Sequence, residues 1–502
     1  MKRATLSIDT GAVVGPVRRR TFGAFVEHLG RCVYEGIYDP ESPFADEDGF
    51  RKDIIDLVKE LGISTIRYPG GNFVSGYRWE DGVGPKDKRP RRLDLAWHST
   101  EPNTVGTDEF MKWAAKAGVE PMMAVNLGTR GVQESLDLLE YCNHKGGTAL
   151  SDYRAANGSS EPYNVRMWCL GNEMDGPWQT GHKTPREYGR LAAETARAMR
   201  QVDPDLELVA CGSSKYAMPT FGEWERIVLE ETYDQVDYIS AHSYYYEEDG
   251  DMSSFLASAV GMDEFIKAVV ATADSVKVAG RHEKDIHISF DEWNVWYQNR
   301  AESHPPEGDD WPVAPRLLED HYNVADAVVV GNCLITLLRH TDRVHAASLA
   351  QLVNVIAPIM CETETRAWKQ TTFHPFAQAS NMAKGSVLNV RIDSPSIETK
   401  RFGDAPLVDA VATYDEASGE IVVFAVNRDQ EGSIELNLDF IGDSVEVVDA
   451  TSYYSDDIYW QASLEDDTSV VPQPNETVSN ENGSLTVELP PVSWNTIRVK
   501  SK

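Results

Sequence analysis

The segment FRKDIIDLVKELGISTIRYPGGNF, residues 50–73, shows the structural unit that decides the fold. Its first half places apolar residues at helical spacing, and Gly62 stands where a helix C-terminal cap belongs. The apolar run at residues 64–68 follows at once and predicts a buried strand. Helices that alternate with buried strands are typical of βα units and a parallel sheet.

The same alternation runs through most of the chain, and Gly118 marks a second predicted helix cap. Eight apolar runs predict strands at residues 22–26, 64–68, 121–126, 165–170, 206–211, 238–242, 286–290 and 346–351. Eight strands with intervening helices close most simply into an α/β fold of the (β/α)8 TIM barrel type. An open doubly wound sheet is disfavoured because no GxGxxG motif follows any of these strands.

The pattern changes after the eighth strand. A helix-like stretch at residues 371–385 leads into period-2 strands at residues 407–415, 420–429, 433–440, 445–454 and 484–491, which is typical of an all-β sandwich. We therefore expect an N-terminal strand in residues 1–18 that pairs with the sandwich, a catalytic barrel in residues 19–384, and a β-sandwich of the jelly-roll type in residues 385–502.

The charge of the chain limits its partners. Eighty acidic residues against 47 Lys and Arg leave a net charge of −33. Such a surface repels phosphate backbones and anionic lipids, so nucleic-acid and membrane partners are disfavoured. No run approaches the roughly 18 apolar residues of a membrane span.

Targeting and redox signals point to the cytoplasm. The N-terminus lacks the apolar run of a secretory signal, and Arg18, Arg19 and Arg20 interrupt it. The six cysteines are far apart and never form a CxxC pair, so neither a zinc site nor a disulfide framework is indicated.

Two carboxylates follow predicted barrel strands. Glu173 comes just after the fourth strand and Glu292 just after the seventh. TIM-barrel active sites form at the C-terminal strand ends, and these two strands can face each other across the mouth. Glycoside hydrolysis needs two carboxyl groups across one bond, about 5 to 5.5 Å apart for retention and about 6.5 to 9.5 Å for inversion. The sequence therefore indicates a glycosidase.

Other polar residues follow several predicted strands, although each alone could be structural. They are Glu27 and His28, Arg67, Gly70, Gly71 and Asn72, His242 and Tyr244, and Gln351 and Asn354. Five tryptophans fall in predicted loops at the same face, where indoles could stack on sugar rings: Trp97, Trp178, Trp293, Trp296 and Trp311.

These motifs together resemble family 51 of the glycoside hydrolases, the α-L-arabinofuranosidases. The blocks that carry the resemblance run nearly end to end and include FGAFVEHLGRCVYEGIYDP, IRYPGGNFVSGYRWEDGVGP, LAWHSTEPN, WCLGNEMDGPWQ, AHSYY, FDEWNVWY and AQLVNVIAPIM. The chain departs from the family pattern in two acidic loops, at residues 241–251 and 303–313, so its linkage preference stays open.

The resemblance implies a retaining, exo-acting enzyme that releases arabinofuranose from arabino-oligosaccharides, arabinan or arabinoxylan fragments. Glu173 would be the general acid/base and Glu292 the nucleophile. The positions that would bind substrate or orient the nucleophile are Glu27, Arg67, Asn72, Asn172, His242, Tyr244 and Gln351, with Trp97, Trp178 and Trp296 near the sugar. It further implies an intracellular homohexamer that uses no cofactor or metal.

Three alternatives remain. A β-xylosidase or endo-glucanase of the same fold would differ only in its pocket. A metal-dependent sugar isomerase would use ligands drawn from Glu27, Glu173, Asp175, His242 and Asp291. A catalytically silent carbohydrate-binding scaffold is disfavoured because both carboxylates are present.

Overall fold

The computed structural model describes residues 1–442, 444–481 and 484–501, and its centre is a closed barrel of eight parallel strands. Around the barrel these strands are β3 (Gly23–Phe25), β4 (Thr65–Tyr68), β7 (Glu120–Val125), β8 (Met167–Leu170), β9 (Glu207–Ala210), β10 (Tyr238–Tyr245), β11 (His287–Val295) and β12 (Val344–Leu349). Each strand overlaps one of the eight predicted runs, in the same order. The predicted TIM barrel is confirmed.

The helices that follow the strands match the predicted amphipathic runs. They are α1 (Lys52–Leu61), α2 (Thr107–Ala117), α3 (Val132–Asn143), α5 (Pro185–Val202), α6 (Glu223–Thr232), α8 (Ser258–Gly280), α9 (Val324–Arg339) and α10 (Phe373–Met382). Gly62 and Gly118 cap α1 and α2 with left-handed φ values of 75° and 74°, as predicted. Helices α4 (Ala149–Ala156) and α7 (Met252–Leu256) were not predicted from the sequence. The buried residues of α4 are Ser151 and Arg154, so no apolar stripe marks that helix.

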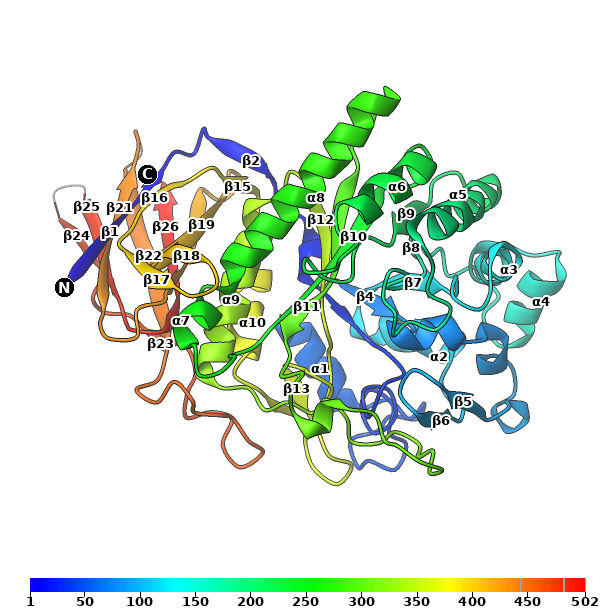
Figure 1. Cartoon of the computed structure of the whole chain (residues 1–502). Coiled ribbons are helices and arrows are strands. Elements are labelled where there is room, and N and C mark those ends of the chain that lie inside the picture. The colour runs from blue at the N-terminus through cyan, green and yellow to red at the C-terminus, as the bar shows by residue number, and fades with distance from the viewer. Residues whose placement is uncertain (443, 482–483, 502) are drawn as a thin grey trace.

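Most of the remaining strands build a two-sheet sandwich beside the barrel (Figure 1). One sheet has the order β16 (Arg391–Asp393), β1 (Lys2–Ile8), β21 (Ile434–Phe440), β25 (Ser484–Leu489), β24 (Ser479–Glu481). The other has the order β2 (Val13–Pro16), β15 (Ser386–Leu388), β19 (Val408–Asp415), β20 (Glu420–Asn427), β26 (Ser493–Ser501), β22 (Val445–Tyr453), β23 (Gln473–Pro474). The mostly β C-terminal region is confirmed, while the boundaries at residues 18 and 384 stay a prediction.

The N-terminal strand β1 belongs to the sandwich by its hydrogen bonds and its packing. It pairs in parallel with β21 over its whole length. Ala4, Leu6 and Ile8 are buried in the same apolar cluster as residues of the two sheets. The chain thus starts in the sandwich and then enters the barrel.

Short elements complete the chain between these regions. They are β5 (Arg92–Asp94), β6 (Ser99–Glu101), β13 (Ile359–Met360), β14 (Trp368–Lys369), β17 (Ser396–Thr399), β18 (Gly403–Pro406) and the 3-10 turns η1 (Arg19–Phe22), η2 (Asn72–Gly76), η3 (Trp79–Gly82), η4 (Lys86–Lys88) and η5 (Ala301–Ser303). In the part of the chain described, no helix is long and apolar enough to cross a membrane. The six cysteines are buried and free.

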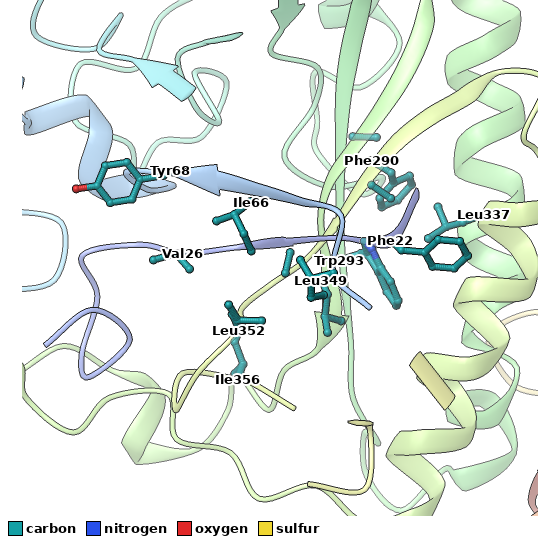
Figure 2. Close-up of a cluster of buried hydrophobic side chains, with 14 of the residues drawn as sticks. Phe22, Val26, Ile66, Tyr68, Phe290, Trp293, Leu337, Leu349, Leu352 and Ile356 are labelled. Carbon is teal, nitrogen blue, oxygen red and sulfur yellow. The ribbon is translucent and has the colours of Figure 1, made fainter. Parts of the chain in front are cut away.

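Helix α9 joins the two regions. Figure 1 shows it between the barrel and the sandwich, and it contacts β11 and β12 on one side and β19, β20 and β26 on the other. Almost all of its residues are buried, which explains why its sequence reads as an apolar run. Apolar side chains such as Phe22, Phe290 and Leu337 continue this core between the barrel and α9 (Figure 2).

Candidate active site

The two glutamates singled out in the sequence lie close together at the barrel mouth. Glu173 is on the loop after β8, where its backbone takes a left-handed φ of 43°. Glu292 lies inside β11, which continues to Val295 and does not end at residue 290 as predicted. One oxygen of Glu173, one oxygen of Glu292 and one ring nitrogen of His242 all lie within 4.8 Å of one another. Both glutamate side chains are buried.

A β-bulge in β11 gives two consecutive residues access to this centre. Between β10 and β11 the register runs from Ser240 and Ser289 to His242 and Glu292, so β11 holds one residue more than its neighbour. The same extra residue appears against β12. Bulges are common near active sites because they redirect side chains. Here Asp291 and Glu292 both contact His242 instead of pointing to opposite sides of the strand.

Glu292 is held by three donors from other strands. Arg67 Nη1 donates to its Oε1 at 2.8 Å, and the Tyr244 hydroxyl donates to its Oε2 at 2.8 Å. His242 Nδ1 is 3.5 Å from the same Oε2. Burial raises the pKa of Glu292, and the neighbouring Glu173 adds to that rise, while the cations His242 and Arg67 oppose it. These contacts orient the carboxylate and favour its ionised form.

Glu173 has two partners of its own. His242 Nδ1 lies 2.8 Å from its Oε1, and the Trp178 indole Nε1 donates to its Oε2 at 2.7 Å. Trp178 is 45% exposed, which places its ring between the buried glutamate and solvent. Lys215 Nζ lies 5.5 Å from the centre of that ring. Glu173 therefore has a protein environment on one side and an open, aromatic edge on the other.

His242 connects the glutamates to Asp291. Its Nε2 lies 2.8 Å from Asp291 Oδ1, opposite the Nδ1 that faces Glu173. Burial acts to lower the pKa of His242, but Glu292, Asp291 and Glu173 outweigh it and raise the pKa to about 10. At neutral pH the ring is a cation with N–H donors at both nitrogens.

Arg67 provides the second cation. Its Nη2 donates to Asn172 Oδ1 at 2.6 Å, its Nε lies 3.8 Å from Asp291 Oδ2, and its guanidinium covers the Phe25 ring at 4.7 Å. Burial acts to lower the pKa of Arg67, yet Asp291 and Glu292 raise it overall. The arginine stays charged and fixes the relative positions of Glu292 and Asn172.

Glu27 forms a second carboxylate site beside Glu292. It accepts hydrogen bonds from Phe73 N at 2.9 Å, from Trp97 Nε1 at 3.0 Å and from Gln351 Nε2 at 3.2 Å. Burial is the main cause that raises its pKa to about 8, against the effect of the Phe73 and Trp97 donors. A Cβ added to Gly71 would come 3.0 Å from Glu292 Oε1 and 3.3 Å from Glu27 Oε2. Only glycine lets the chain pass so close to both carboxylates.

Three amide side chains lie next to one another at the mouth. Asn172 Nδ2 lies 3.5 Å from both Asn72 Oδ1 and Gln179 Oε1, and Gln179 donates to Ser75 Oγ. Gln179 was not predicted as a site residue, because a single glutamine in a loop carries no pattern. Asp291 was predicted only as a ligand of the isomerase hypothesis.

Some of the predicted residues serve the fold instead. Trp293 lies within β11 and is fully buried in the core, so its predicted place in a loop was wrong (Figure 2). His28 contacts Glu101 and Tyr68, and Asn354 bonds backbone groups of Arg31 and Cys361. Trp311 stacks on His98. Trp296 remains near the site, where it packs edge to face with Tyr244 at 5.0 Å.

The donor set does not suit a metal ion. Among the described residues, Glu173, His242 and Glu292 form a group with closely spaced potential ligand atoms. Metal binding requires a ring nitrogen with a free lone pair, but both His242 nitrogens face carboxylates and the raised pKa of the ring favours its protonated form. Arg67 already occupies Glu292 Oε1. Asp175, another ligand of the isomerase hypothesis, instead accepts hydrogen bonds from Ser214 N and Oγ.

Family models and curated relatives named as α-L-arabinofuranosidases match this chain. Models for the α-L-arabinofuranosidase 1 domain and the α-L-arabinofuranosidase C-terminal domain match residues 57–263 and 291–493. An exo-α-(1→6)-L-arabinofuranosidase of Bifidobacterium longum is 56% identical, with 100% of this chain and 98% of that protein covered. An intracellular exo-α-(1→5)-L-arabinofuranosidase of Streptomyces lividans is also 56% identical, with 99% and 75% covered.

Structural similarity agrees with these sequence matches. The solved structure of a family 51 α-L-arabinofuranosidase from Bifidobacterium longum superposes with a TM-score of 0.95 and 49% identity, and 99% of each chain is covered. The barrel, the sandwich and the sequence are therefore shared over the full length. The chain belongs to the α-L-arabinofuranosidases of glycoside hydrolase family 51.

Proposed function

We propose that this protein is a retaining, exo-acting α-L-arabinofuranosidase that releases terminal L-arabinofuranose from arabino-oligosaccharides, arabinan or arabinoxylan fragments. The observation that carries the proposal is the pair of buried glutamates with oxygens within 4.8 Å of each other. Retaining glycosidases hold their two carboxyl groups about 5 to 5.5 Å apart, whereas inverting ones leave about 6.5 to 9.5 Å for a water. The short separation favours a double displacement.

In the first step Glu292 attacks the anomeric carbon of the arabinofuranose. A carboxylate acts as a nucleophile only when it is ionised and aimed. The Arg67 guanidinium and the Tyr244 hydroxyl support both requirements, one on each oxygen of Glu292. The bond to the leaving group breaks as a covalent glycosyl ester forms on Glu292.

Glu173 serves as the acid in that step and as the base in the next. It gives its proton to the departing glycosidic oxygen and later removes a proton from the water that cleaves the ester. Its position beside the half-exposed Trp178 supports this role, because the leaving group must depart toward solvent. The product keeps the anomeric configuration of the substrate.

The remaining predicted residues would hold the sugar. Glu27, Asn72, Asn172 and Gln351 line the space beside Glu292, and Trp97 and Trp296 contribute aromatic surface. Gln351 Oε1 is buried without a hydrogen-bond partner. Such an atom costs free energy unless a ligand pairs with it. It supports a substrate that brings a hydroxyl group into the mouth.

The proposal is tested by initial rates on aryl α-L-arabinofuranoside, β-D-xylopyranoside and β-D-glucopyranoside, each with and without EDTA. We expect fast, EDTA-insensitive hydrolysis of the arabinofuranoside alone. Proton NMR during the first turnovers should show the α-anomer of arabinose before mutarotation. A faster rate on the xyloside or glucoside would contradict the sugar assignment, and an early β-anomer would contradict retention.

The linkage preference requires its own measurement. Relatives of equal identity are named for (1→6) and for (1→5) linkages, so overall identity does not decide between them. Rates on (1→5)- and (1→6)-linked arabino-oligosaccharides, measured side by side, would assign it.

The family also supports a cellular location and an oligomeric state for the enzyme. The relative from Streptomyces lividans is named intracellular, and this supports a cytoplasmic location and substrates that have already been shortened to oligosaccharides. The family resemblance supports a homohexamer. Light scattering coupled to gel filtration would give a mass about six times 55.9 kDa if the hexamer forms.

A further inference from the structure

Asp291 is a fully buried carboxylate next to Glu292 that the proposed reaction does not use. We propose that Asp291 is a positioning residue that keeps His242 a cation, so that the ring balances the negative charge of Glu292 before attack and that of Glu173 after it. This inference rests on the proposed function and adds a device that links its two steps.

The backbone brings Asp291 to this place. In a regular strand Asp291 and Glu292 would face opposite sides. The bulge in β11 is seen from both neighbouring strands, and it allows Asp291 to reach the same histidine as Glu292. A bulge that serves only to end pairing would not need a charged side chain at its centre.

The contacts of His242 favour a ring with two protons. Asp291 Oδ1 lies 2.8 Å from Nε2, and Glu173 Oε1 lies 2.8 Å from Nδ1. A neutral imidazole has a proton on one nitrogen only, so its other nitrogen would point a lone pair at a carboxylate. A neutral ring would satisfy both contacts only by accepting the proton of Glu173 at Nδ1, which would take that proton away from the leaving group, whereas the cation donates at both nitrogens.

The charges around His242 agree with this state. Glu173 and Asp175 face it from the loop after β8, and Asp291 and Glu292 face it from β11. Arg67, from β4, is the opposing cation, and it contacts Asp291 and Glu292. Cys169 in β8 lies near Asp291. Carboxylates outnumber cations here, and the pKa of His242 is about 10 despite burial.

The geometry matches the movement of charge in a double displacement. His242 Nδ1 forms its hydrogen bond with Glu173 Oε1 at 2.8 Å, and the same nitrogen lies 3.5 Å from Glu292 Oε2, so the charged ring faces both carboxyl groups. Before attack the negative charge is on Glu292. When the ester forms, that charge is lost, and Glu173 becomes the anion because its proton has left with the alcohol. The cationic ring, whose Nδ1 already faces Glu173, then stabilises that anion, and no proton leaves His242.

The test is Asp291→Asn, which keeps the size of the side chain and removes its charge. Carbon-13 labelled histidine allows the His242 ring to be titrated by NMR. The signal of His242 is assigned as the one that disappears in the His242→Gln variant. We expect the pKa of His242 to fall by at least about two units. We expect kcat on aryl arabinofuranoside to fall about 100-fold, the scale for loss of one preorganised donor, with KM changed less than about threefold. In Asp291→Asn the activity should also decline at a lower alkaline pH than in the wild type, because the His242 ring becomes neutral there.

Two further variants separate charge from folding. Asp326→Asn removes another buried carboxylate, which accepts hydrogen bonds from Tyr297 and from Asn323 N at the start of α9. It should leave kcat and the His242 titration unchanged. Asp291→Glu restores the charge and should return the His242 pKa toward that of the wild type. Melting temperatures of all variants show whether each one folds.

The outcomes are distinct. An unchanged His242 titration or an unchanged kcat in folded Asp291→Asn would overturn the inference. A similar loss in Asp326→Asn would also overturn it, because any buried charge would then matter. If wild type hydrolyses no arabinofuranoside, the proposed function fails, while the His242 titration still reports whether Asp291 holds the cation.

Discussion

The barrel mouth and the barrel–sandwich interface both contain a buried arginine beside an aspartate. They differ in how many of their buried polar atoms have hydrogen-bond partners. At the interface, Arg428 lies 3.1 Å from Asp409, and Asn332 donates to Asp409 at 2.8 Å. Arg428 also donates to Pro406 O and to Asn332. Among the described residues, no side-chain atom of this cluster is buried without a partner.

The mouth leaves buried polar atoms unpaired. Arg67 Nε, Gln351 Oε1 and Asp175 Oδ1 are buried without a hydrogen-bond partner. Native cores rarely tolerate such atoms, because each costs about 1 to 3 kcal/mol of stability. These two clusters therefore differ in use: the one that joins barrel and sandwich is closed on itself, whereas the one at the mouth keeps an acceptor atom free for a ligand.

The largest effect should come from Glu292→Ala, which removes the nucleophile from the open cluster. No covalent intermediate can form, so kcat should fall by about four orders of magnitude or more on every arabinofuranoside. Steady-state rates on aryl and natural substrates measure this. Substantial remaining activity would remove Glu292 from its assigned role.

Glu173→Ala should have an effect that depends on the leaving group. Loss of acid assistance should slow natural arabinosides by about a thousandfold and slow the first step on activated aryl arabinosides far less. Burst kinetics on the aryl substrate should show the accumulated intermediate. Equal losses on both substrate types would contradict the acid role.

The closed cluster should respond in stability and not in catalysis. Asp409→Ala leaves Arg428 buried without its carboxylate, and breaking a buried pair costs about 3 to 5 kcal/mol. Thermal unfolding should begin at lower temperature, while kcat and KM at 25 °C stay unchanged. A lowered kcat with an unchanged melting temperature would show that the interface acts on the site.

The smallest effects are in the pH dependence of stability. The slope of stability against pH should have opposite signs for a carboxylate of the mouth and a carboxylate of the interface. Burial raises the pKa of Glu27 to about 8, so folding favours its protonated form and stability falls as pH rises from about 4.5 to 8. Glu27→Gln should remove this slope and gain a few degrees in melting temperature relative to wild type at pH 8.

Asp409 acts in the opposite direction. Although burial alone would raise its pKa, Arg339 and Arg428 lower it below 3.8. Its stabilising contribution is present above that value and is lost as pH falls through the lowered pKa. The difference in melting temperature between wild type and Asp409→Asn should therefore shrink only in strongly acidic solution. If the melting-temperature difference from wild type changed with pH in the same way for Glu27→Gln and Asp409→Asn, the expected opposite behaviour of the two clusters would be wrong.

The sequence alone was sufficient for the barrel and for the two glutamates. Apolar periodicity is a local property, so it marked all eight strands, the helix caps at Gly62 and Gly118, and the position of Glu173 after β8. Because strand ends of a closed barrel converge, residues far apart such as Arg67 and Glu292 could be expected at one mouth. Their roles rest on the family resemblance and on the mutations above.

Only the tertiary structure decided how individual side chains are used. The bulge that brings Asp291 to His242 depends on pairing with β10 and β12, and no local pattern reports it. Trp293 and Trp296 lie on the same segment, yet one fills the core and the other packs at the site. Asp409 pairs with residues of α9 that are about 70 to 77 positions away. Periodicity determines which elements form, while partner, register and burial are set by contacts between distant parts of the chain.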